Sequence, residues 1–470
     1  MKIGIIGGGT GGLVTALILK YRFSNIQIDL IKSDKIGIIG VGEGSTEHWN
    51  EFMNFCDISL KELLTETGAT FKYGVMFEGW TKEKYFHNVT HDLFSLKFGQ
   101  YLGGYAYTIK KQLSPKDYTC TPCFDFKIDS VNLPYQYHFD TFKLNKFLLK
   151  KCKKKGVNII DDEIEEVNVK KNKIDKIKSK TKTYQYDLYV DSTGFKRLLI
   201  SKLGAKWVSY KKYLPLNEAI AFQTPDTDEY NPYTLAKAMN AGWMWRIPTQ
   251  GRWGNGYVFD NKFINAEEAK KECEEYLKTK VTIGKNIKFE AGSLDKVWIG
   301  NCMATGLSSS FIEPMEASSI GCTIQQAFIL MHCLPNYESS VDFYNDKFKN
   351  IIENIRDFVV LHYLVKINKG KFWKRKVNLP PSLEKNLKKW AHRLPITEDF
   401  HTKYSLFQEH NFAIILKELN LVDKDLITKE FDCLSNNLKE HIKLKVLDLA
   451  KKRYQTMGHK EGLQLLKNSL

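Results

Sequence analysis

The chain has 470 residues, of which 43% are hydrophobic and 26% are charged, so its composition excludes disordered and collagen-like proteins. Its length predicts two or three domains, or one large α/β domain with an insertion. The net charge of +16 comes mostly from lysine spread along the chain, without zinc-finger spacing, an RNP-like motif or a basic region followed by heptads, so we attribute it to a solvated surface and expect no nucleic-acid binding.

Nine cysteines are scattered along the chain, and several lie inside apolar runs, which indicates free thiols in a reducing compartment. Cys120 and Cys123 form a lone CxxC without a second pair of ligands, so we expect no metal site. No run approaches the roughly 18 apolar residues of a membrane span, and the glycine-rich N-terminus lacks a cleavage site. We therefore expect a mature cytoplasmic protein.

The first predicted elements are a strand at 2–6, a helix at 13–21 and a strand at 26–32, which together form a βαβ unit. The first turn carries GxGxxG, whose glycines allow a tight turn, a close approach of the backbone to pyrophosphate, and packing of the helix on the strand. The helix N-terminus then faces the anion. We assign dinucleotide binding to five residues of this turn, Gly7, Gly9, Thr10, Gly11 and Gly12.

The acidic residue that holds the ribose in such a unit should end the second strand. Lys32 occupies that place and cannot accept a hydrogen bond, so Asp34 is the candidate two residues later. A second glycine-rich segment at 40–46 precedes a helical stretch and supplies two more candidates for the cofactor site, Gly42 and Glu43.

The segment 69–80 alternates like a strand, with Lys72, Gly74 and Met76 on one face and aromatic residues on the other. Later segments predict, in chain order, a lysine-rich helix end at 150–155, a solvated hairpin at 170–182, a buried strand and small-residue turn at 188–195, an aromatic hairpin at 242–248 and 251–259, and a strand, loop and long apolar helix at 298–334. The chain is mostly helical from about residue 340.

A single dinucleotide fingerprint, followed by a strand near residue 190 and a glycine-rich segment near residue 300, favours FAD over NAD. The sequence contains no second phosphate-binding GxGxxG for a nicotinamide. A flavoenzyme of this kind must be reduced by another protein.

Several motifs then occur together over much of residues 1–375: Gly7-x-Gly9-x-x-Gly12, Gly40-Val41-Gly42-Glu43, Phe71-Lys72 ahead of Trp80, His138-Phe139-Asp140, Asp191-Ser192-Thr193-Gly194, Trp243-x-Trp245-x-Ile247-Pro248, the segment 306–316, and Arg356-Asp357-Phe358 with His362-Tyr363. In these motifs the sequence resembles flavin-dependent halogenases of the tryptophan-halogenase type. The Trp-x-Trp-x-Ile-Pro stretch separates that family from related flavin monooxygenases. The lysine- and isoleucine-rich composition suggests an AT-rich coding sequence of viral type. From the resemblance we expect a viral-type member of the family that accepts broad aromatic substrates.

The resemblance implies an α/β fold, with a Rossmann-type, monooxygenase-like (GR2) FAD-binding core, an inserted sheet and a mostly helical C-terminal substrate region. We expect the core at 1–375 and the helical region at 376–470. Asp191 and Gly194 join the cofactor-binding residues. We expect no membrane partner, and the sequence leaves open whether the protein forms a homo-oligomer.

The family's catalytic pair falls on Lys72 and Glu316. From the residues alone, Lys72 reads as a surface lysine on a strand, and Glu316 as an acid at a helix N-terminus. Desolvation beside aromatic residues would lower the pKa of the Lys72 amine and make it a nucleophile or a hydrogen-bond donor. The serine that usually follows the glutamate is replaced by Ala317. This replacement removes a hydroxyl from the expected proton-handling site.

The family's halide site falls on backbone N–H groups at Ser318 and Ser319, where a helix N-terminus makes an anion site. Trp243 and Trp245 would otherwise be core aromatic residues. In the family they keep the organic substrate away from the flavin, so that it is halogenated rather than hydroxylated.

The implied enzyme uses FAD as FADH2, O2 and a halide ion (chloride, bromide or iodide), with a separate flavin reductase. It makes hypohalous acid and transfers the halogen through Lys72 to a small electron-rich aromatic molecule of the indole or phenol type. Residues 85–105 align ambiguously, so His87, His91 and Phe94 remain alternatives for the substrate-binding aromatic residue. Two other functions stay open: a flavin-dependent aromatic monooxygenase, and a basic flavoprotein that binds nucleic acid or a partner.

Overall fold

The computed structural model describes residues 1–88, 100–113, 126–129, 133–134, 136–400, 404–451 and 456–469. The chain divides into two units, each made of three stretches. Unit 1 comprises Met1–Ala69, Phe139–Pro215 and Glu290–Ile355, and unit 2 comprises Thr70–His138, Leu216–Phe289 and Arg356–Leu470. The boundary expected at residue 375 is a different division, and it falls inside the last stretch of unit 2.

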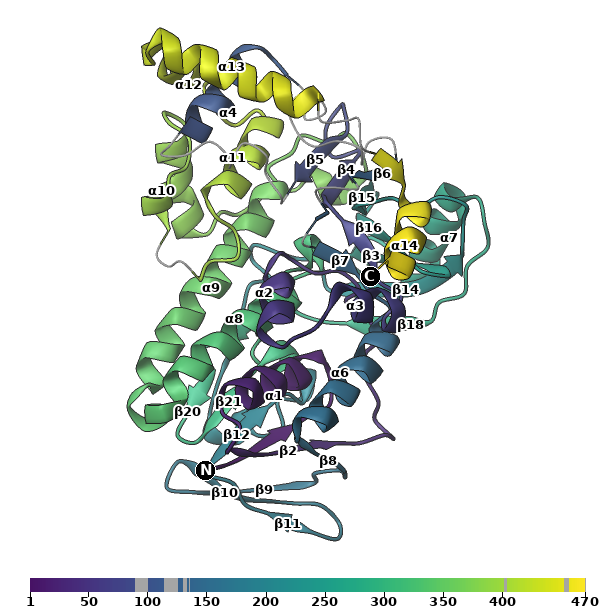
Figure 1. Cartoon of the computed structure of the whole chain (residues 1–470), viewed down its shortest axis with the longest axis vertical. Helices are drawn as coiled ribbons and strands as arrows, with labels where there is room; N and C mark the ends of the chain where they lie inside the picture. Colours follow the sequence, from purple (N-terminus) through teal and green to yellow (C-terminus); the bar gives the residue numbers. More distant parts are fainter. Residues whose placement is uncertain are drawn as a thin grey trace. The chain divides into compact units, whose positions relative to one another are not determined.

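Unit 1 is built on a six-stranded sheet in which five neighbouring strands are parallel and β20 is an antiparallel edge (Figure 1). In spatial order the strands are β20 (Trp298–Ile299), β21 (Cys302–Ala304), β12 (Leu188–Asp191), β1 (Lys2–Ile6), β2 (Gln27–Lys32) and β8 (Asn158–Asp161). The apolar residues of β1 are buried, as a parallel sheet covered on both faces requires. The expected Rossmann-type core is therefore confirmed.

Helix α1 (Thr10–Arg22) follows β1 and packs against α6 (Thr141–Lys155) and α8 (Ser318–Cys333). Its residues 12–19 are all buried, because neighbouring elements cover it on several sides. The remaining elements of unit 1 include the helix α2 (His48–Phe55), the hairpin β9 (Glu166–Lys170) and β10 (Lys173–Lys178) with β11 (Thr183–Tyr184), and the small sheet of β13 (Trp207–Ser209), β19 (Gly292–Leu294) and β22 (Ser310–Phe311).

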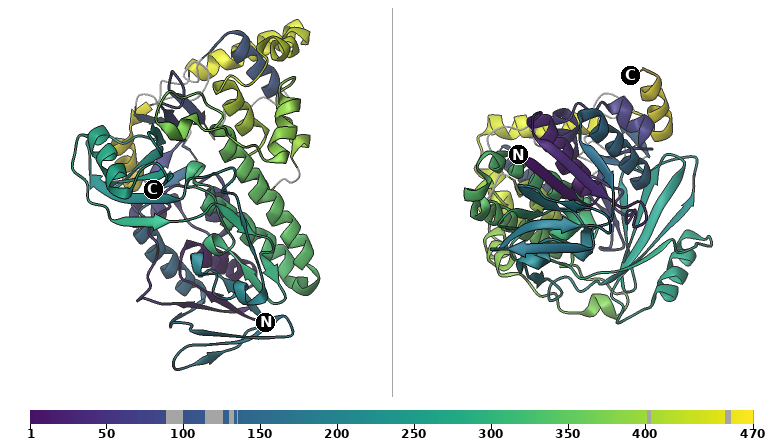
Figure 2. Two further views of the ribbon diagram at one scale, coloured as in Figure 1. Left: turned by 180° about the vertical axis from the view of Figure 1, so that it is seen from behind. Right: turned by 90° about the horizontal axis from the view of Figure 1, so that it is seen from below.

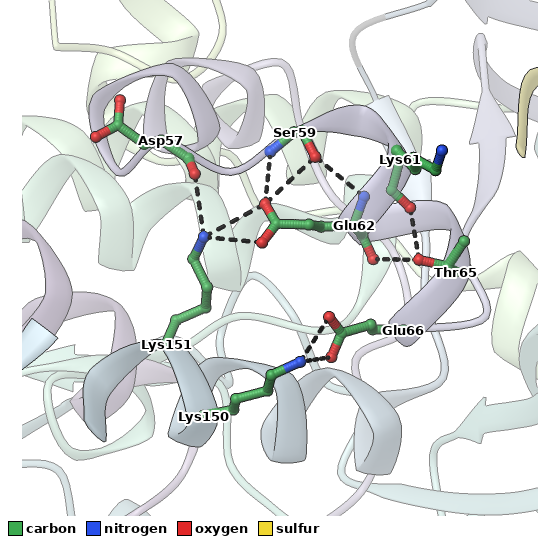
Figure 3. A network of polar contacts seen from close by, with 8 residues as sticks. All are labelled: Asp57, Ser59, Lys61, Glu62, Thr65, Glu66, Lys150 and Lys151. Carbon is green, nitrogen blue, oxygen red and sulfur yellow. Dashed lines mark hydrogen bonds and ion pairs between the residues drawn. The ribbon is translucent and has the colours of Figure 1, made fainter. Parts of the chain in front are cut away.

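A polar network joins α3 (Leu60–Glu66) to α6 within unit 1 (Figure 3). Ser59 and Glu62 form a capping box at the start of α3. The ammonium of Lys151, which is nearly buried, donates to the Asp57 carbonyl at 3.0 Å and lies 3.2 Å from a Glu62 carboxylate oxygen. The Glu62 carboxylate therefore accepts a hydrogen bond at the N-terminus of α3 and also balances the charge of the buried Lys151.

Replacing Ser59 by alanine is expected to lower the free energy of unfolding by about 1 kcal/mol, because the Glu62 N–H loses its side-chain acceptor. Chemical denaturation measures this difference. Ser59→Asp, which keeps an acceptor at the N-cap, is the control. Equal stabilities of the alanine variant and the unmodified protein would contradict the assignment.

Unit 2 contains a seven-stranded sheet, with α7 (Ala266–Leu277) beside β14 and β17 (Figure 2). Its strands in spatial order are β18 (Lys285–Lys288), β14 (Glu218–Pro225), β17 (Arg252–Phe259), β16 (Gly242–Thr249), β15 (Thr234–Met239), β4 (Gly74–Glu78) and β5 (Tyr85–Asn88). The aromatic hairpin expected at 242–259 is confirmed as β16 and β17, which pair in register across their whole length.

The strand expected at 69–80 is two strands in different sheets. β3 (Thr70–Lys72) pairs with β7 (Gln136–His138), whereas β4 pairs with β15 and β5. The break falls at Tyr73, whose N–H donates to the Pro232 carbonyl at 2.8 Å and whose hydroxyl accepts the Asp129 N–H at 2.9 Å. These tertiary contacts override a continuous alternation that the sequence alone predicts.

The remaining elements of unit 2 are mostly helical, as expected for the C-terminal part. They are α4 (Gln100–Lys110), α10 (Pro381–Trp390), α11 (Glu409–Glu418), α12 (Lys424–Cys433), α13 (Asn436–Lys451) and α14 (His459–Ser469), with β6 (Lys127–Asp129) paired to β23 (Thr456–Gly458). The long helix α9 (Val341–His362) belongs to unit 1 up to Ile355 and to unit 2 from Arg356. Within the described ranges, no helix is long and apolar enough to cross a membrane.

Candidate active site

The glycine-rich turn between β1 and α1 leaves room for a ligand at one position. At Gly7, whose φ is +116°, a Cβ atom would lie 2.1 Å from the Ser192 carbonyl oxygen, and at Gly12 it would lie 2.3 Å from the Gly7 oxygen. At Gly9, with φ of −73°, a Cβ would meet no protein atom within 4 Å. Protein packing therefore requires the outer glycines, and the middle one faces open space.

Gly9 is also the N-cap of α1, and it has no side chain that could accept a hydrogen bond from the first turn. The first N–H groups of a helix need such acceptors, and an anion can supply them. An open glycine at an uncapped helix N-terminus fits the pyrophosphate of FAD. Thr10 and Gly11 begin that helix, and a Cβ at Gly11 would lie 3.4 Å from the Gly306 Cα atom.

Asp191 ends β12 and is fully buried. Its carboxylate accepts hydrogen bonds from Thr193 N–H at 3.0 Å, Leu199 N–H at 2.8 Å and Ile200 N–H at 2.9 Å, and from the Ser308 hydroxyl at 3.1 Å. These bonds shape the turn after β12. A direct contact between Asp191 and the cofactor stays a prediction.

The other cofactor candidates lie in unit 1, several of them near open space or at its surface. The Asp34 carboxylate is exposed and ion-paired with Lys32, whose hydrogen bond and charge lower the Asp34 pKa. At Gly42, with φ of +109°, and at Gly194, with φ of +69°, a Cβ atom would meet no protein atom within 4 Å. The Glu43 carbonyl accepts the Phe139 N–H at 2.8 Å. Their contacts with FAD stay predictions.

Glu316 lies in a backbone segment with unusual geometry. Glu316 has φ 62° and ψ 7°, and Ala317 has φ 54° and ψ 33°, so two consecutive residues with Cβ atoms are left-handed. Such conformations cost on the order of 1 kcal/mol each and cluster at functional sites. Glu316 is itself buried, with 4% of its surface exposed. Glu316 is therefore not a solvent-exposed acid at a helix end.

Ala317 is the N-cap of α8, and its side chain offers no acceptor to the first turn of that helix. The next two residues, Ser318 and Ser319, line a small pocket together with Gly306, Ser309, Thr323 and Gln326. The Ser309 hydroxyl is held by the Gly306 carbonyl at 2.8 Å and by Gln326 at 3.1 Å. Since Gly306 approaches Gly11, this pocket lies next to the dinucleotide turn within unit 1.

Lys72 is buried in unit 2, with 1% of its surface exposed, which excludes a surface lysine. Its partner in the β3–β7 register is Gln136, and His138 lies opposite Thr70. The His138 ring lies 3.3 Å from the Thr70 hydroxyl and 2.9 Å from the Thr234 hydroxyl. Burial, and then the charge of Lys72, lower the pKa of His138 well below its usual value.

A second buried histidine, His459, lies behind β3. Its Nε2 atom accepts the Phe71 N–H at 3.0 Å, and burial lowers the pKa of His459 to about 3. Both histidines are therefore neutral near pH 7. Sequence reasoning missed both roles: His138 stood in a family motif without an assigned role, and nothing near His459 marks it.

Because of these two buried histidines, we expect the free energy of unfolding to depend on pH. Their folded-state pKa values are lowered, so below about pH 6.5 the unfolded chain binds more protons than the folded chain, and acid favours unfolding. We expect a loss of roughly 1.4 kcal/mol per pH unit from His459 as the pH falls from about 6.5 towards 4, and a further loss in the same direction from His138. Thermal unfolding followed across this range measures the slope, which His459→Gln should reduce. A flat profile would contradict the prediction.

Trp243 and Trp245 share one face of β16, with ring centroids 6.3 Å apart, and both are buried. The register aligns Trp245 with Ala236 and Ala236 with Phe77, so all three share that face. The strand pairing places His87 on the same face, opposite Val75.

His87 is enclosed by protein in unit 2. Its Nε2 atom lies 3.2 Å from the Asn411 amide nitrogen, and its ring lies 5.2 Å from that of Phe358 and 6.4 Å from that of His362. The other two substrate candidates, His91 and Phe94, lie outside the described residues, as do Cys120 and Cys123. In the part of the chain that is described, no group of His, Cys, Asp and Glu residues could hold a metal ion.

Comparison with known proteins gives one consistent result. A family model described as tryptophan halogenase matches residues 2–429. Tryptophan 6-halogenase SttH of Streptomyces toxytricini is 29% identical, over 88% of each chain, and tryptophan 7-halogenase RebH of Lentzea aerocolonigenes is 29% identical, over 90% of each.

Solved structures agree over nearly the whole chain. The SttH crystal structure has a TM-score of 0.84 at 27% identity, covering 98% of this chain and 99% of its own. Tar14, a tryptophan C-6 flavin-dependent halogenase from taromycin biosynthesis, has a TM-score of 0.89 at 25% identity and covers 99% of both chains.

Proposed function

Because the chain belongs to the tryptophan halogenase family, we propose that Lys72 receives an oxidised halogen and transfers it to a small electron-rich aromatic molecule. The enzyme is a flavin-dependent halogenase that uses FAD, O2 and halide. The observation that supports the role of Lys72 is its burial beside His138, whose lowered pKa leaves that imidazole uncharged near neutral pH.

The residues of unit 1 hold the reactants. The uncapped N-terminus of α1 and the open backbone at Gly9 bind the FAD pyrophosphate, and the backbone N–H groups of Ser318 and Ser319 hold halide in the small pocket. When bound, FADH2 with O2 and halide supplies hypohalous acid. A separate flavin reductase provides FADH2, because the sequence has no second nucleotide fingerprint.

The residues Lys72 and Glu316 carry the later steps. The neutral Lys72 amine forms an N–halogen bond as water leaves, or the ammonium form holds hypohalous acid by a hydrogen bond. The aromatic ring then takes the halogen at carbon, and the electrons of the broken bond stay on the Lys72 nitrogen or, in the hydrogen-bonded route, on the hydroxide. The displaced ring proton passes to the Glu316 carboxylate, and a proton returns to that nitrogen or hydroxide, which restores the amine or releases water. Trp243 and Trp245 keep the ring away from the flavin, which favours halogenation over hydroxylation.

The substrate class is an indole or a phenol, and free tryptophan is one member to test. We also propose a reducing, cytoplasmic setting, because the buried cysteines of the described residues are free thiols.

The test incubates the enzyme with FAD, a flavin reductase and each of chloride, bromide and iodide, in the presence of a panel of indoles and phenols. Mass spectrometry should detect products that carry the supplied halogen, and none without halide. Hydroxylated products that form without halide would instead identify an aromatic monooxygenase. Binding of DNA with a steep salt dependence, without any product, would favour a nucleic-acid-binding flavoprotein.

A further inference from the structure

We propose that His459 is a positioning residue that fixes the backbone of β3 and thereby the place of Lys72. The proposal rests on the proposed function of Lys72 and adds to it a residue from the far end of the chain. His459 is the first residue of α14, and 388 positions separate it from Phe71.

The contact between His459 and β3 is both polar and apolar. The Phe71 N–H donates to His459 Nε2 at 3.0 Å, and the two rings stack with centroids 5.9 Å apart and planes 28° apart. Phe71 directly precedes Lys72. An unprotonated ring nitrogen of His459 therefore accepts a backbone hydrogen bond from β3 at the residue next to Lys72.

The hydrogen bond from Phe71 to His459 restrains a different part of β3 from the bonds of Thr70 and Lys72. Lys72 pairs with Gln136 of β7, and the Thr70 hydroxyl donates to the Pro248 carbonyl at 2.7 Å. Neither of these bonds restrains the Phe71 N–H, which belongs to a fully buried residue and needs an acceptor.

His459 is itself held by the segment around it. β23 ends directly before it and pairs with β6, and the Tyr230 ring meets the His459 ring edge to face at 5.9 Å. The next residue, Lys460, forms an ion pair with Asp226 at 2.9 Å and lies over the Tyr230 ring. The histidine is fully buried, so this acceptor is fixed rather than mobile at the surface.

The restraint predicts a specific defect. Without the acceptor at His459, β3 shifts, and displacements of about 1 Å in a catalytic group can lower a rate up to about a hundredfold. Halogen then leaves the enzyme as free hypohalous acid while flavin oxidation continues. The ratio of halogenated product to FADH2 oxidised should fall, and a soluble β-diketone trap should be halogenated instead.

The experiment compares His459→Gln with His459→Asn. The glutamine amide oxygen reaches the position of Nε2, and the shorter asparagine does not. We expect His459→Asn to lower kcat and the product ratio at least about tenfold with little change in the KM of the aromatic substrate, and His459→Gln to restore most of the ratio. Both are assayed below their unfolding temperatures.

Gln464→Ala is the matched control, since it changes an exposed side chain of α14 without removing the acceptor, and its product ratio should equal that of the unmodified enzyme. Equal ratios in the glutamine and asparagine variants would overturn the proposal. Lys72→Ala separates the two proposals: if that variant still halogenates the substrate, the function of Lys72 is wrong, whatever His459 does.

Discussion

Replacing Lys72 by alanine is expected to lower the yield of halogenated product at least about a hundredfold, because it removes the amine that we propose as the carrier of the halogen to the substrate. FADH2 is still oxidised, since the cofactor residues of unit 1 are unchanged. The measurement records product by mass spectrometry and flavin oxidation by absorbance in the same reaction.

Two further substitutions control this result. Lys72→Arg keeps a positive charge, but a guanidinium stays protonated and cannot form the N–halogen bond, so it should remain inactive if the haloamine route operates. Activity of the arginine variant would favour the hydrogen-bonded route. Lys82→Ala, at an exposed lysine of the same stretch of unit 2, should leave the product yield unchanged. Halogenation by Lys72→Ala would remove the role assigned to the lysine.

Replacing Gly9 by alanine is expected to weaken FAD binding at least about tenfold, or roughly 1.4 kcal/mol, without destabilising the protein in the absence of FAD. The added methyl group meets no protein atom within 4 Å and the backbone has φ of −73°, so only a ligand close to this backbone would sense it. Quenching of FAD fluorescence measures the affinity, and thermal unfolding without FAD measures the stability.

Gly12→Ala is the informative comparison for Gly9→Ala. Its Cβ atom would lie 2.3 Å from the Gly7 carbonyl oxygen, so it should lower the unfolding temperature even without FAD. If Gly9→Ala binds FAD as tightly as the unmodified protein, the pyrophosphate does not lie against this turn.

The parts of the fold that the sequence predicts well depend on local pattern. The βαβ unit follows from the GxGxxG spacing between a strand and a helix, and the hairpin of β16 and β17 follows from two apolar runs with a short turn. Both patterns involve neighbours in the chain, so no distant contact has to be known.

The break at Tyr73 shows what local pattern cannot predict. The acceptor and the donor that Tyr73 meets, at Pro232 and Asp129, are far away in the sequence, and no alternation of residues encodes them. The burial of Lys72 is hidden for a similar reason. An alternating strand has two faces, and the sequence does not reveal that the face with the lysine is covered as well.

In the candidate site, too, some features are predicted by the sequence and others are found only in the folded structure. Family motifs predict Lys72 and Glu316 as the catalytic pair, but the left-handed backbone at Glu316 and Ala317 has no sequence signal, because neither residue is glycine or asparagine. The contact of His459 with Phe71 joins the two ends of unit 2, and only the folded chain reveals it.

We propose that the enzyme stores an oxidised halogen on Lys72 before the aromatic substrate arrives. The most direct measurement lets the enzyme turn over with FADH2, O2 and bromide, removes small molecules by rapid gel filtration, and then adds indole. We expect bromoindole from the isolated enzyme, in an amount approaching one per chain, and none from Lys72→Ala. Equal bromoindole from both proteins, or none from the unmodified enzyme, would contradict it.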